Sequence, residues 1–501
     1  MNCKNFLYSF RTQANSLTRS DVFSGILILS VTSYLIFKGA ITSFTYDEST
    51  SYLYGARGSY YDIIRFTYAS SNNHILNTLF MKVSSGIFGH NELWLRLHSI
   101  LSFLIYGIFS YLILKKLDFF GAVFLLPLLI FNPFLIDFFA LARGYALGLA
   151  FGITTLFYNI KYFENYNRIY LNISLGTAFL MVISVFSFLY LYVAIFLSLI
   201  FITFMINRPL IKDFNKFWKP LLIGGFVLFF IIIQPITTLR SKDQLYFGGT
   251  TNFWQDTVLS LINASSYNAD YGIESPIKYF VIIILIIATA ISIYLILKKR
   301  VIYSDKLLLV HCTIILLIIY GLCELNFQIL GIKFLYERTG IFLIPLFSLL
   351  LCGILHLTLK KYKIPYTIII VILGSVILVK ASSHQYKYYD SYLYWRYDSK
   401  IKEVFGLAIS QQNKDSVEFS VEWVFSPTFL FYKESRGLDK INISSDQENP
   451  SFLKSDYVYI TNRHVLKDTL ESISHFEKKK VYKYPDNIYG IRETIFFVKN
   501  D

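Results

Sequence analysis

Two adjacent carboxylates, Asp47 and Glu48, are the residues whose types and position most suggest chemistry. They follow Tyr46, directly after an apolar segment at about 22–41. Acids at a membrane edge are costly to desolvate, so they are functional candidates by default. A carboxylate there could accept the proton of an attacking hydroxyl. The plainer interpretation is that the pair only ends a helix with interfacial polar groups, and the pair alone leaves both open.

The polar stretch after this pair contains a second group of candidates. Asn72 and Asn73 precede His74, and either asparagine could cap a following helix. The next apolar residues have the spacing of a helix that lies in the membrane interface, with Asn77 and Lys82 on its wet side; they are at positions 75, 76, 79, 80, 83 and 87. His74 is either a structural cap or a substrate contact.

Two acid–arginine combinations follow. Glu92 and Arg96 are four residues apart on one helical face, where an i,i+4 ion pair is the local explanation. Asp137 and Arg143 share a short polar segment and could satisfy each other. Tyr145 completes the sequence Ala-Arg-Gly-Tyr at 142–145.

Arginines are the residues suited to a phosphate. The planar fork of Arg binds oxyanions in a bidentate manner. Arg338 follows Glu337 just before an apolar segment, and Arg57 lies in the first polar stretch. The alternative role for such arginines is interfacial snorkelling.

The composition places these groups in a membrane protein. Of 501 residues, 54% are hydrophobic and 16% charged, against about 25% charged in soluble proteins. Spans of about 20 apolar residues cross a bilayer. The sequence predicts eleven, at roughly 22–41, 95–114, 119–136, 145–160, 169–186, 188–206, 220–238, 277–297, 307–325, 341–359 and 365–381. The fifth and sixth spans form one long apolar run. We divide it near Ser187 because the charges of the loops fit an odd total number of spans.

Charge distribution gives the orientation. With the N-terminus inside, the predicted inner segments hold 18 Lys or Arg in 59 residues and the outer loops 8 in 114. This is the positive-inside pattern, and it predicts an inner N-terminus and an outer C-terminus. The basic inner segments therefore account for the net charge of +14, and nucleic-acid binding is not needed to explain it. All the candidate groups fall on the outer face, although the count made no use of them.

We therefore expect three parts: a cytoplasmic N-terminus at 1–21, a transmembrane domain at 22–382 with a long outer loop at 42–94, and an outer domain at 383–501. In the last part, 399–411 has helical spacing, and 417–425, 456–460 and 491–498 alternate like strands. A second helix is expected at 464–473. The fold class is a multi-pass α-helical membrane protein with a small C-terminal α/β domain.

Taken together, these motifs resemble the GT-C glycosyltransferases, and most closely the bacterial relatives of protein O-mannosyltransferases and of lipid A aminoarabinose transferases. The features are the acidic pair after the first span, the Asn-His segment, the Glu-x-x-x-Arg at 92–96, the Ala-Arg-Gly-Tyr at 142–145 and an outer C-terminal domain. The resemblance covers about residues 20–381. Many relatives have His with two prolines in the first loop, where this chain has His74-Ile75-Leu76.

The resemblance implies transfer of a sugar, with inversion, from a polyprenyl-phosphate donor to a lipid, glycan or protein acceptor. The site would be at the outer face of a bacterial cytoplasmic membrane. Asp47 matches the catalytic aspartate of the family and is the expected general base, with Glu48 as its orienting or substrate-binding neighbour. The expected substrate-binding residues are Arg57, His74, Glu92, Arg96, Asp137, Arg143, Tyr145, Glu337 and Arg338. Of these, Glu92 and Asp137 are the acids expected to orient a sugar hydroxyl or hold a cation.

Two questions stay open at this stage. A divalent metal, Mg²⁺ or Mn²⁺, would suit an oxygen-rich acid cluster, but the sequence contains no unambiguous ligand set. A transporter or flippase of lipid-linked sugars would also have many spans. Transporters usually place ionisable groups near the midplane, often in repeated halves, whereas here the spans are nearly free of charge and show no repeat. An enzyme is therefore favoured over a transporter. A third interpretation, a purely structural membrane protein with a receptor-like outer domain, would leave Asp47 and Glu48 unexplained.

Overall fold

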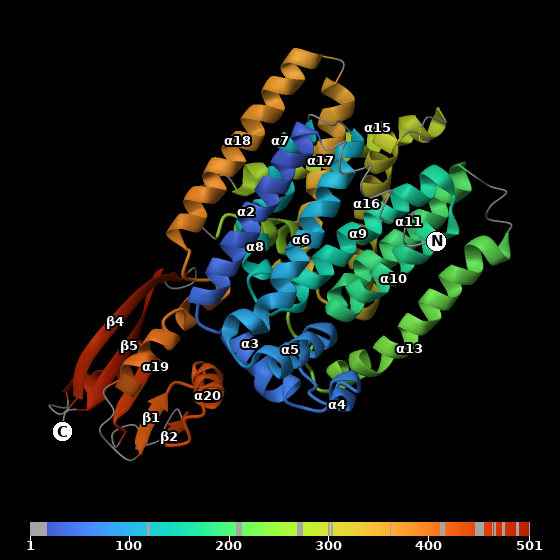
Figure 1. The fold of residues 1–501 in the computed structure, drawn as a ribbon. Helices are drawn as coiled ribbons and strands as arrows, with labels where there is room; N and C mark the ends of the chain where they lie inside the picture. The colour runs from blue at the N-terminus through green and yellow to red at the C-terminus, as the bar shows by residue number, and fades with distance from the viewer. Residues whose placement is uncertain are drawn as a thin grey trace, which may run out of the picture.

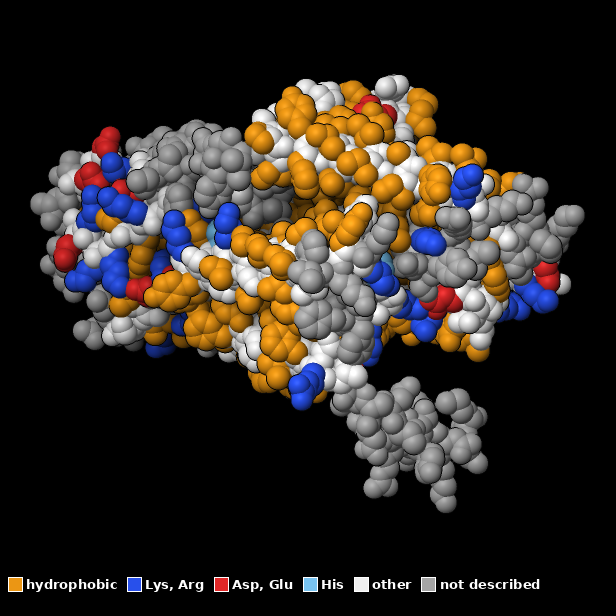
Figure 2. All heavy atoms as spheres, turned by 90° about the horizontal axis from the view of Figure 1, so that it is seen from above, with side chains coloured by type: hydrophobic (Ala, Val, Ile, Leu, Met, Phe, Trp, Pro, Cys, Tyr) orange, Lys and Arg blue, Asp and Glu red, His pale blue; other side chains and the backbone are white. Residues whose placement is uncertain are grey.

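The structure is a computed structural model, and it describes residues 18–117, 121–206, 213–267, 274–298, 301, 304–360, 362–410, 416–445, 455–462, 464, 467–472, 476–486 and 490–499. The chain forms a body of packed helices with a small sheet domain at one end (Figure 1). Hydrophobic side chains cover much of the middle of the molecule, and charged side chains gather toward both ends, one of which carries the sheet (Figure 2). This distribution is expected of a helical body that lies in lipid and a domain that lies in water.

Seven described helices are long and apolar enough to cross a membrane. They are α2 (Arg19–Ile41), α6 (Glu92–Leu117), η2 (Phe186–Phe188) continued by α11 (Leu189–Ile206), η3 (Phe214–Trp218) continued by α13 (Lys219–Ser241), α15 (Glu274–Leu297), α16 (Ser304–Leu330) and α18 (Lys363–Lys387). The multi-pass helical class is thereby confirmed.

Two further helices, α7 (Gly121–Ile130) and α8 (Pro133–Phe139), are apolar enough only as a pair and are bent by 69° at the break between them, as in a broken span or a re-entrant loop. Pro133 lacks an N–H, and the Asn132 side chain accepts from the N–H groups of Phe134 and Leu135, so a new helix begins there. The bend places Asp137 and the turn after it at the end of the bundle.

The remaining predicted spans coincide with α9 (Gly144–Asn165), α10 (Arg168–Ser184) and α17 (Leu343–Leu359). The last two have 17 residues each, and α9 is buried along almost its whole length. All eleven predicted segments are therefore helical, while the number of crossings stays a prediction. The predicted division near Ser187 is confirmed, because Val185 is extended (φ −153°) between α10 and η2.

The segment 42–94 contains α3 (Tyr46–Thr50), η1 (Ser51–Ala56), α4 (Tyr60–Ile64) and α5 (Ile75–Phe88). The predicted amphipathic helix is present as α5, with Phe80, Val83 and Ile87 exposed. Two expectations about it are wrong. Asn77 is fully buried, and its Oδ1 accepts a hydrogen bond from His98 Nε2 at 2.7 Å, instead of facing water. The N-cap is His74, without a side-chain bond, because Asn72 and Asn73 make other contacts.

The C-terminal domain is a five-stranded sheet of order β2-β1-β3-β5-β4. Its strands are β1 (Val417–Val421), β2 (Ile441–Ser444), β3 (Tyr457–Thr461), β4 (Phe476–Asp486) and β5 (Gly490–Lys499), with helices α19 (Ile401–Ser410), α20 (Ser426–Ser435) and α21 (Lys467–Ser472). β1 pairs in parallel with β2 and β3, and β5 is antiparallel to β3 and β4. The sequence missed α20, β2 and β4.

The sheet domain shares a core with the segment that carries the two acids. Phe44 and Tyr52 pack in one apolar cluster with Ile401, Phe405 and Phe431. Phe44 and Phe431 are stacked, with ring centroids 4.2 Å apart. The first loop is consequently held between the helical body and the C-terminal domain.

Candidate active site

Asp47 is the second residue of the short helix α3. Thr45 caps this helix: its hydroxyl accepts from the Glu48 N–H, while the Glu48 carboxylate accepts from the Thr45 N–H. The reciprocal cap fixes the start of α3 and aims the Asp47 side chain away from Glu48. Asp47 keeps 13% of its side chain exposed, whereas Glu48 has none.

Two arginines from distant parts of the chain face Asp47. Its Oδ2 is 3.4 Å from Arg143 Nη2 and 3.5 Å from Arg338 Nη1. Closed charge-assisted hydrogen bonds have about 2.7–2.9 Å between heavy atoms, so both contacts are loose. Within the part of the chain that the structure describes, Oδ1 of Asp47 has no hydrogen-bond partner. The carboxylate is thus held by charge through Oδ2, while Oδ1 remains available.

Arg143 lies in the turn between α8 and α9, where it is the N-cap residue of α9. Its side chain is 2% exposed and donates to the side-chain oxygen of Asn72. Asn72 in turn donates to the Asp47 main-chain oxygen (2.9 Å). Sequence analysis considered Asn72 only as a helix cap, and the structure places it between Arg143 and α3.

Arg338 comes from η5 (Glu337–Gly340), just before α17. Its guanidinium lies over the rings of Phe247 (4.9 Å) and Trp395 (5.8 Å), which hold the charge by cation–π attraction. The negative charge of Asp47 raises the pKa of Arg338 despite its burial. Glu337 has a left-handed backbone (φ 46°), and burial raises the pKa of its carboxyl.

His74 and Tyr145 pack against each other next to Arg143. The two rings meet edge to face with centroids 5.2 Å apart, and the Tyr145 ring lies 6.0 Å from the Arg143 guanidinium. Burial, and then the positive charges of Arg143 and Arg338, hold the pKa of His74 well below its ordinary value. The imidazole is therefore neutral, and its buried Nε2 has no partner among the described residues.

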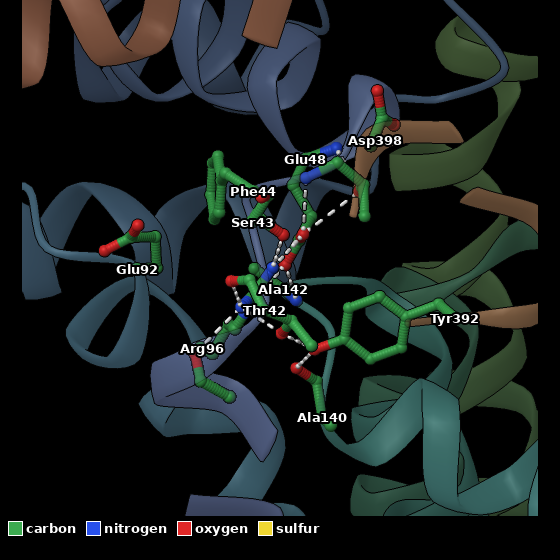
Figure 3. A network of polar contacts seen from close by, with 12 residues as sticks. Thr42, Ser43, Phe44, Glu48, Glu92, Arg96, Ala140, Ala142, Tyr392 and Asp398 are labelled. Carbon is green, nitrogen blue, oxygen red and sulfur yellow. Dashed lines mark hydrogen bonds and ion pairs between the residues drawn. The ribbon is translucent and has the colours of Figure 1, made fainter. Parts of the chain in front are cut away.

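Glu48 belongs to a sealed network and not to the open site. The Arg96 guanidinium donates to both Glu48 oxygens (2.8 and 2.6 Å), and both side chains are fully buried. Arg96 also donates to the main-chain oxygens of Gly39, Thr42 and Ser43, at the end of α2. Figure 3 shows this pair with its partners Thr42 and Ser43, and with Tyr392 beside it, whose hydroxyl is hydrogen-bonded to that of Thr42.

Two pairings suggested by the sequence are wrong. Arg96 binds Glu48, while Glu92 binds Lys402 (3.0 Å) and the Tyr432 hydroxyl (3.0 Å) from the C-terminal domain. Tertiary packing overrides the i,i+4 spacing, because Arg96 points to the α2 end and Glu92 to the sheet domain.

Likewise, Asp137 binds Lys38 and not Arg143. The Lys38 ammonium is 2.8 Å from Asp137, and both groups are buried. The Tyr267 hydroxyl and the Leu393 N–H also donate to this carboxylate. Arg57 is exposed and pairs with Glu434, away from the Asp47 site.

Gly144 is required where the Ala-Arg-Gly-Tyr segment passes α10. A Cβ at this position would lie 2.0 Å from the Ser184 main-chain oxygen and 2.9 Å from His74 Cβ. We expect Gly144→Ala to lower the melting temperature of the purified protein and to displace Arg143. The matched control is Gly176→Ala in α10, where a Cβ meets nothing within 4 Å. That change should be neutral or stabilising, by up to about 1 kcal/mol; equal melting temperatures would contradict the close approach.

A resident metal has no ready ligand set in the described part of the chain. No group of three or more His, Cys, Asp or Glu side chains there lies close enough to hold a metal ion. The acids proposed from the sequence as cation ligands, Glu92 and Asp137, have ammonium partners instead.

Comparison with known proteins gives structural matches only. No family model and no curated protein matches the sequence. The structure is similar to ArnT from Cupriavidus metallidurans bound to undecaprenyl phosphate, with a TM-score of 0.43 and 11% identity over 94% of this chain and 97% of that chain. For apo ArnT the TM-score is 0.42, with 10% identity and the same coverage.

Proposed function

We propose that the protein is a membrane glycosyltransferase with Asp47 as the general base. It transfers a sugar from a polyprenyl-phosphate-linked donor to an acceptor hydroxyl of a lipid, glycan or protein, with inversion, on the outer side of the membrane. The single observation that supports this assignment is the loose arrangement of Asp47 between Arg143 and Arg338. A carboxylate that could act as base then has two cations suited to phosphate within 3.5 Å of one of its oxygens.

The other acids proposed from the sequence are less suited to take a proton. Glu48 is engaged by Arg96, Glu92 by Lys402, and Asp137 by Lys38, each at 3.0 Å or less. A carboxylate in such a pair must break a short ion pair before it can bind a proton. Asp47, at 3.4–3.5 Å from its arginines, need not do so.

The proposed reaction is a single displacement. The acceptor oxygen forms a bond to the anomeric carbon as the bond from that carbon to the phosphate oxygen breaks. The acceptor proton moves to Asp47, and the electron pair leaves with the phosphate. Arg143 and Arg338 stabilise the charge that develops on the phosphate, because guanidinium groups present paired donors to its oxygens.

The test is a transfer assay with purified protein in lipid nanodiscs. A panel of labelled polyprenyl-phosphate sugars is incubated with lipid, glycan and peptide acceptors, and release of polyprenyl phosphate is followed. We expect one donor to be consumed in a protein-dependent manner. The opposite result, donor that crosses a vesicle bilayer without being consumed, would favour a flippase instead.

The arginines give a prediction specific to this site. Arg143→Ala and Arg338→Ala should each weaken binding of polyprenyl phosphate, because each removes a cation next to Asp47 at the proposed phosphate position. Arg→Lys should restore only part of the affinity, because Lys keeps the charge and loses the fork. Binding is measured by titration of undecaprenyl phosphate into nanodisc-embedded protein.

Arg65→Ala is the matched control, because Arg65 is an exposed arginine of the same outer loop that lies over the Tyr61 ring. It should leave the affinity unchanged. Equal affinities for wild type and both site variants would assign Arg143 and Arg338 to packing and remove the phosphate site from the proposal.

A further inference from the structure

The short helix that carries Asp47 needs support from outside itself. α3 has five residues, and isolated helices shorter than about 12–15 residues are marginal in water. Its capping box engages the Thr45 and Glu48 N–H groups. The direction in which Asp47 points therefore depends on what holds the remaining main chain of α3.

Asp398 supplies that contact, from 352 residues away. Its Oδ2 accepts a hydrogen bond from the Tyr46 N–H, at 2.7 Å. Asp398 ends η6 (Leu393–Asp398), the turn between α18 and the C-terminal domain. Figure 3 shows it beside the Glu48–Arg96 network. The donor is the residue immediately before Asp47.

The other buried acids of this region are paired with a lysine or an arginine, whereas Asp398 has no such partner among the described residues. It is fully buried, no ion pair among the described residues includes it, and its Oδ1 has no hydrogen-bond partner there. Burial and the negative charges of Asp47 and Glu48 raise its pKa well above the ordinary 3.8. The raised pKa favours the uncharged form of this carboxyl, and its Oδ2 accepts the Tyr46 N–H in either form.

We infer that Asp398 is a positioning residue, which fixes the Tyr46 main chain and thereby presents Asp47 to Arg143 and Arg338. The catalytic consequence rests on the proposed function, whereas the structural contact does not. The inference makes the C-terminal segment part of the active site and gives its junction with α18 a role in turnover. A displacement of about 1 Å in a reacting group can cost about 100-fold in rate.

The chemistry of the contact makes two substitutions informative. Asp398→Asn keeps a carbonyl oxygen of the same size and position, and an amide is uncharged like the protonated acid. Asp398→Leu has the same branched shape and number of heavy atoms but no acceptor. If Asp398 acts by accepting the Tyr46 N–H, Asn should replace it and Leu should not.

The first measurement is hydrogen–deuterium exchange of the peptide that spans residues 44–50, followed by mass spectrometry. The full-length wild type and Asp398→Asn should exchange alike, and Asp398→Leu should exchange at least tenfold faster at the Tyr46 amide. Unchanged exchange in Asp398→Leu would overturn the contact. This readout does not depend on any sugar donor, so it separates failure of the inference from failure of the proposed function.

The second measurement is turnover of whichever donor the wild type accepts. Asp398→Asn should stay within threefold of wild type. Asp398→Leu should lose about 100-fold in kcat with less than a threefold change in the KM for donor, because the misplaced group acts in the transition state. Equal losses in both variants would show that an ionised Asp398 takes part in the chemistry and would overturn the positioning role.

The third measurement is the melting temperature as a function of pH. Burial raises the pKa of Asp398 in the folded protein, so folding takes up a proton between pH 3.8 and the raised pKa. The contribution of this group to stability therefore falls as pH rises through that window. Asp47 and Glu48 face it from α3, with Tyr397 and Tyr459 nearby. The melting temperature of Asp398→Asn relative to wild type should therefore be higher at pH 8 than at pH 4.5. A pH-independent difference would contradict the uncharged state.

Discussion

Asp47→Asn is expected to reduce kcat by about 10²- to 10⁴-fold, the usual effect of losing a general base. The amide has nearly the shape of the carboxylate, so α3 and its contacts should persist. It cannot take the acceptor proton. Donor binding should be retained or tighter, because Asp47 is the negative charge next to Arg143 and Arg338, and its removal leaves both cations free for phosphate.

The measurement pairs turnover with binding of undecaprenyl phosphate, both in nanodiscs. Asp62→Asn is the control, because Asp62 lies in the same segment 42–94 and its side chain bonds only within its own capping box. It should match wild type in both assays. Wild-type turnover by Asp47→Asn would exclude Asp47 as the base. Reduced turnover together with weaker phosphate binding would instead indicate that Asp47 organises the arginines.

The sequence was sufficient to predict the helices of the membrane body and the group of residues from which the site is built. Apolar runs of about 20 residues specify membrane helices without reference to any partner, and every predicted span lies on a helix. The asymmetry of Lys and Arg placed all the candidates on one face, and the structure brings Asp47, Arg143 and Arg338 together from that set.

The partners of the charged groups could not be predicted in this way. Local spacing assigned Glu92 to Arg96 and Asp137 to Arg143, but both acids are bound by lysines from other elements, Lys402 and Lys38. Lys38 lies within an apolar span, where a single lysine gives no hint of its partner. Spacing identifies the face of a helix and not the segment that packs on it.

Asp398 was missed for the same reason. It lies in an aromatic stretch at 392–398, among the scattered acids and bases of the tail, and no local motif connects it to α3. Only the packing of the C-terminal domain on residues 44–56 brings it to Tyr46. An unpaired acid beside several aromatic residues is the one signal that could have marked it.

Glu48→Gln is the second large effect we expect, and it should be on stability and not primarily on chemistry. Glu48 accepts from Arg96, from the Thr45 N–H and from the Ala142 N–H. A glutamine has one oxygen and one NH₂, so at least one of these donors loses its acceptor. Arg96 would also remain as a buried cation without a counter-charge, and breaking a buried ion pair from one side costs about 3–5 kcal/mol.

The expected result is a marked fall in melting temperature and in the yield of folded protein, measured on detergent-solubilised samples. The matched control is Glu92→Gln, whose partner Lys402 is 33% exposed and can turn to solvent, so its loss should be much smaller. The double variant Glu48→Gln/Arg96→Gln should recover part of the loss, because it removes the stranded charge as well. Were Glu48→Gln to melt like wild type and fail only in turnover, Glu48 would be a catalytic acid, and the buried network with Arg96 would not be what holds α3 in place.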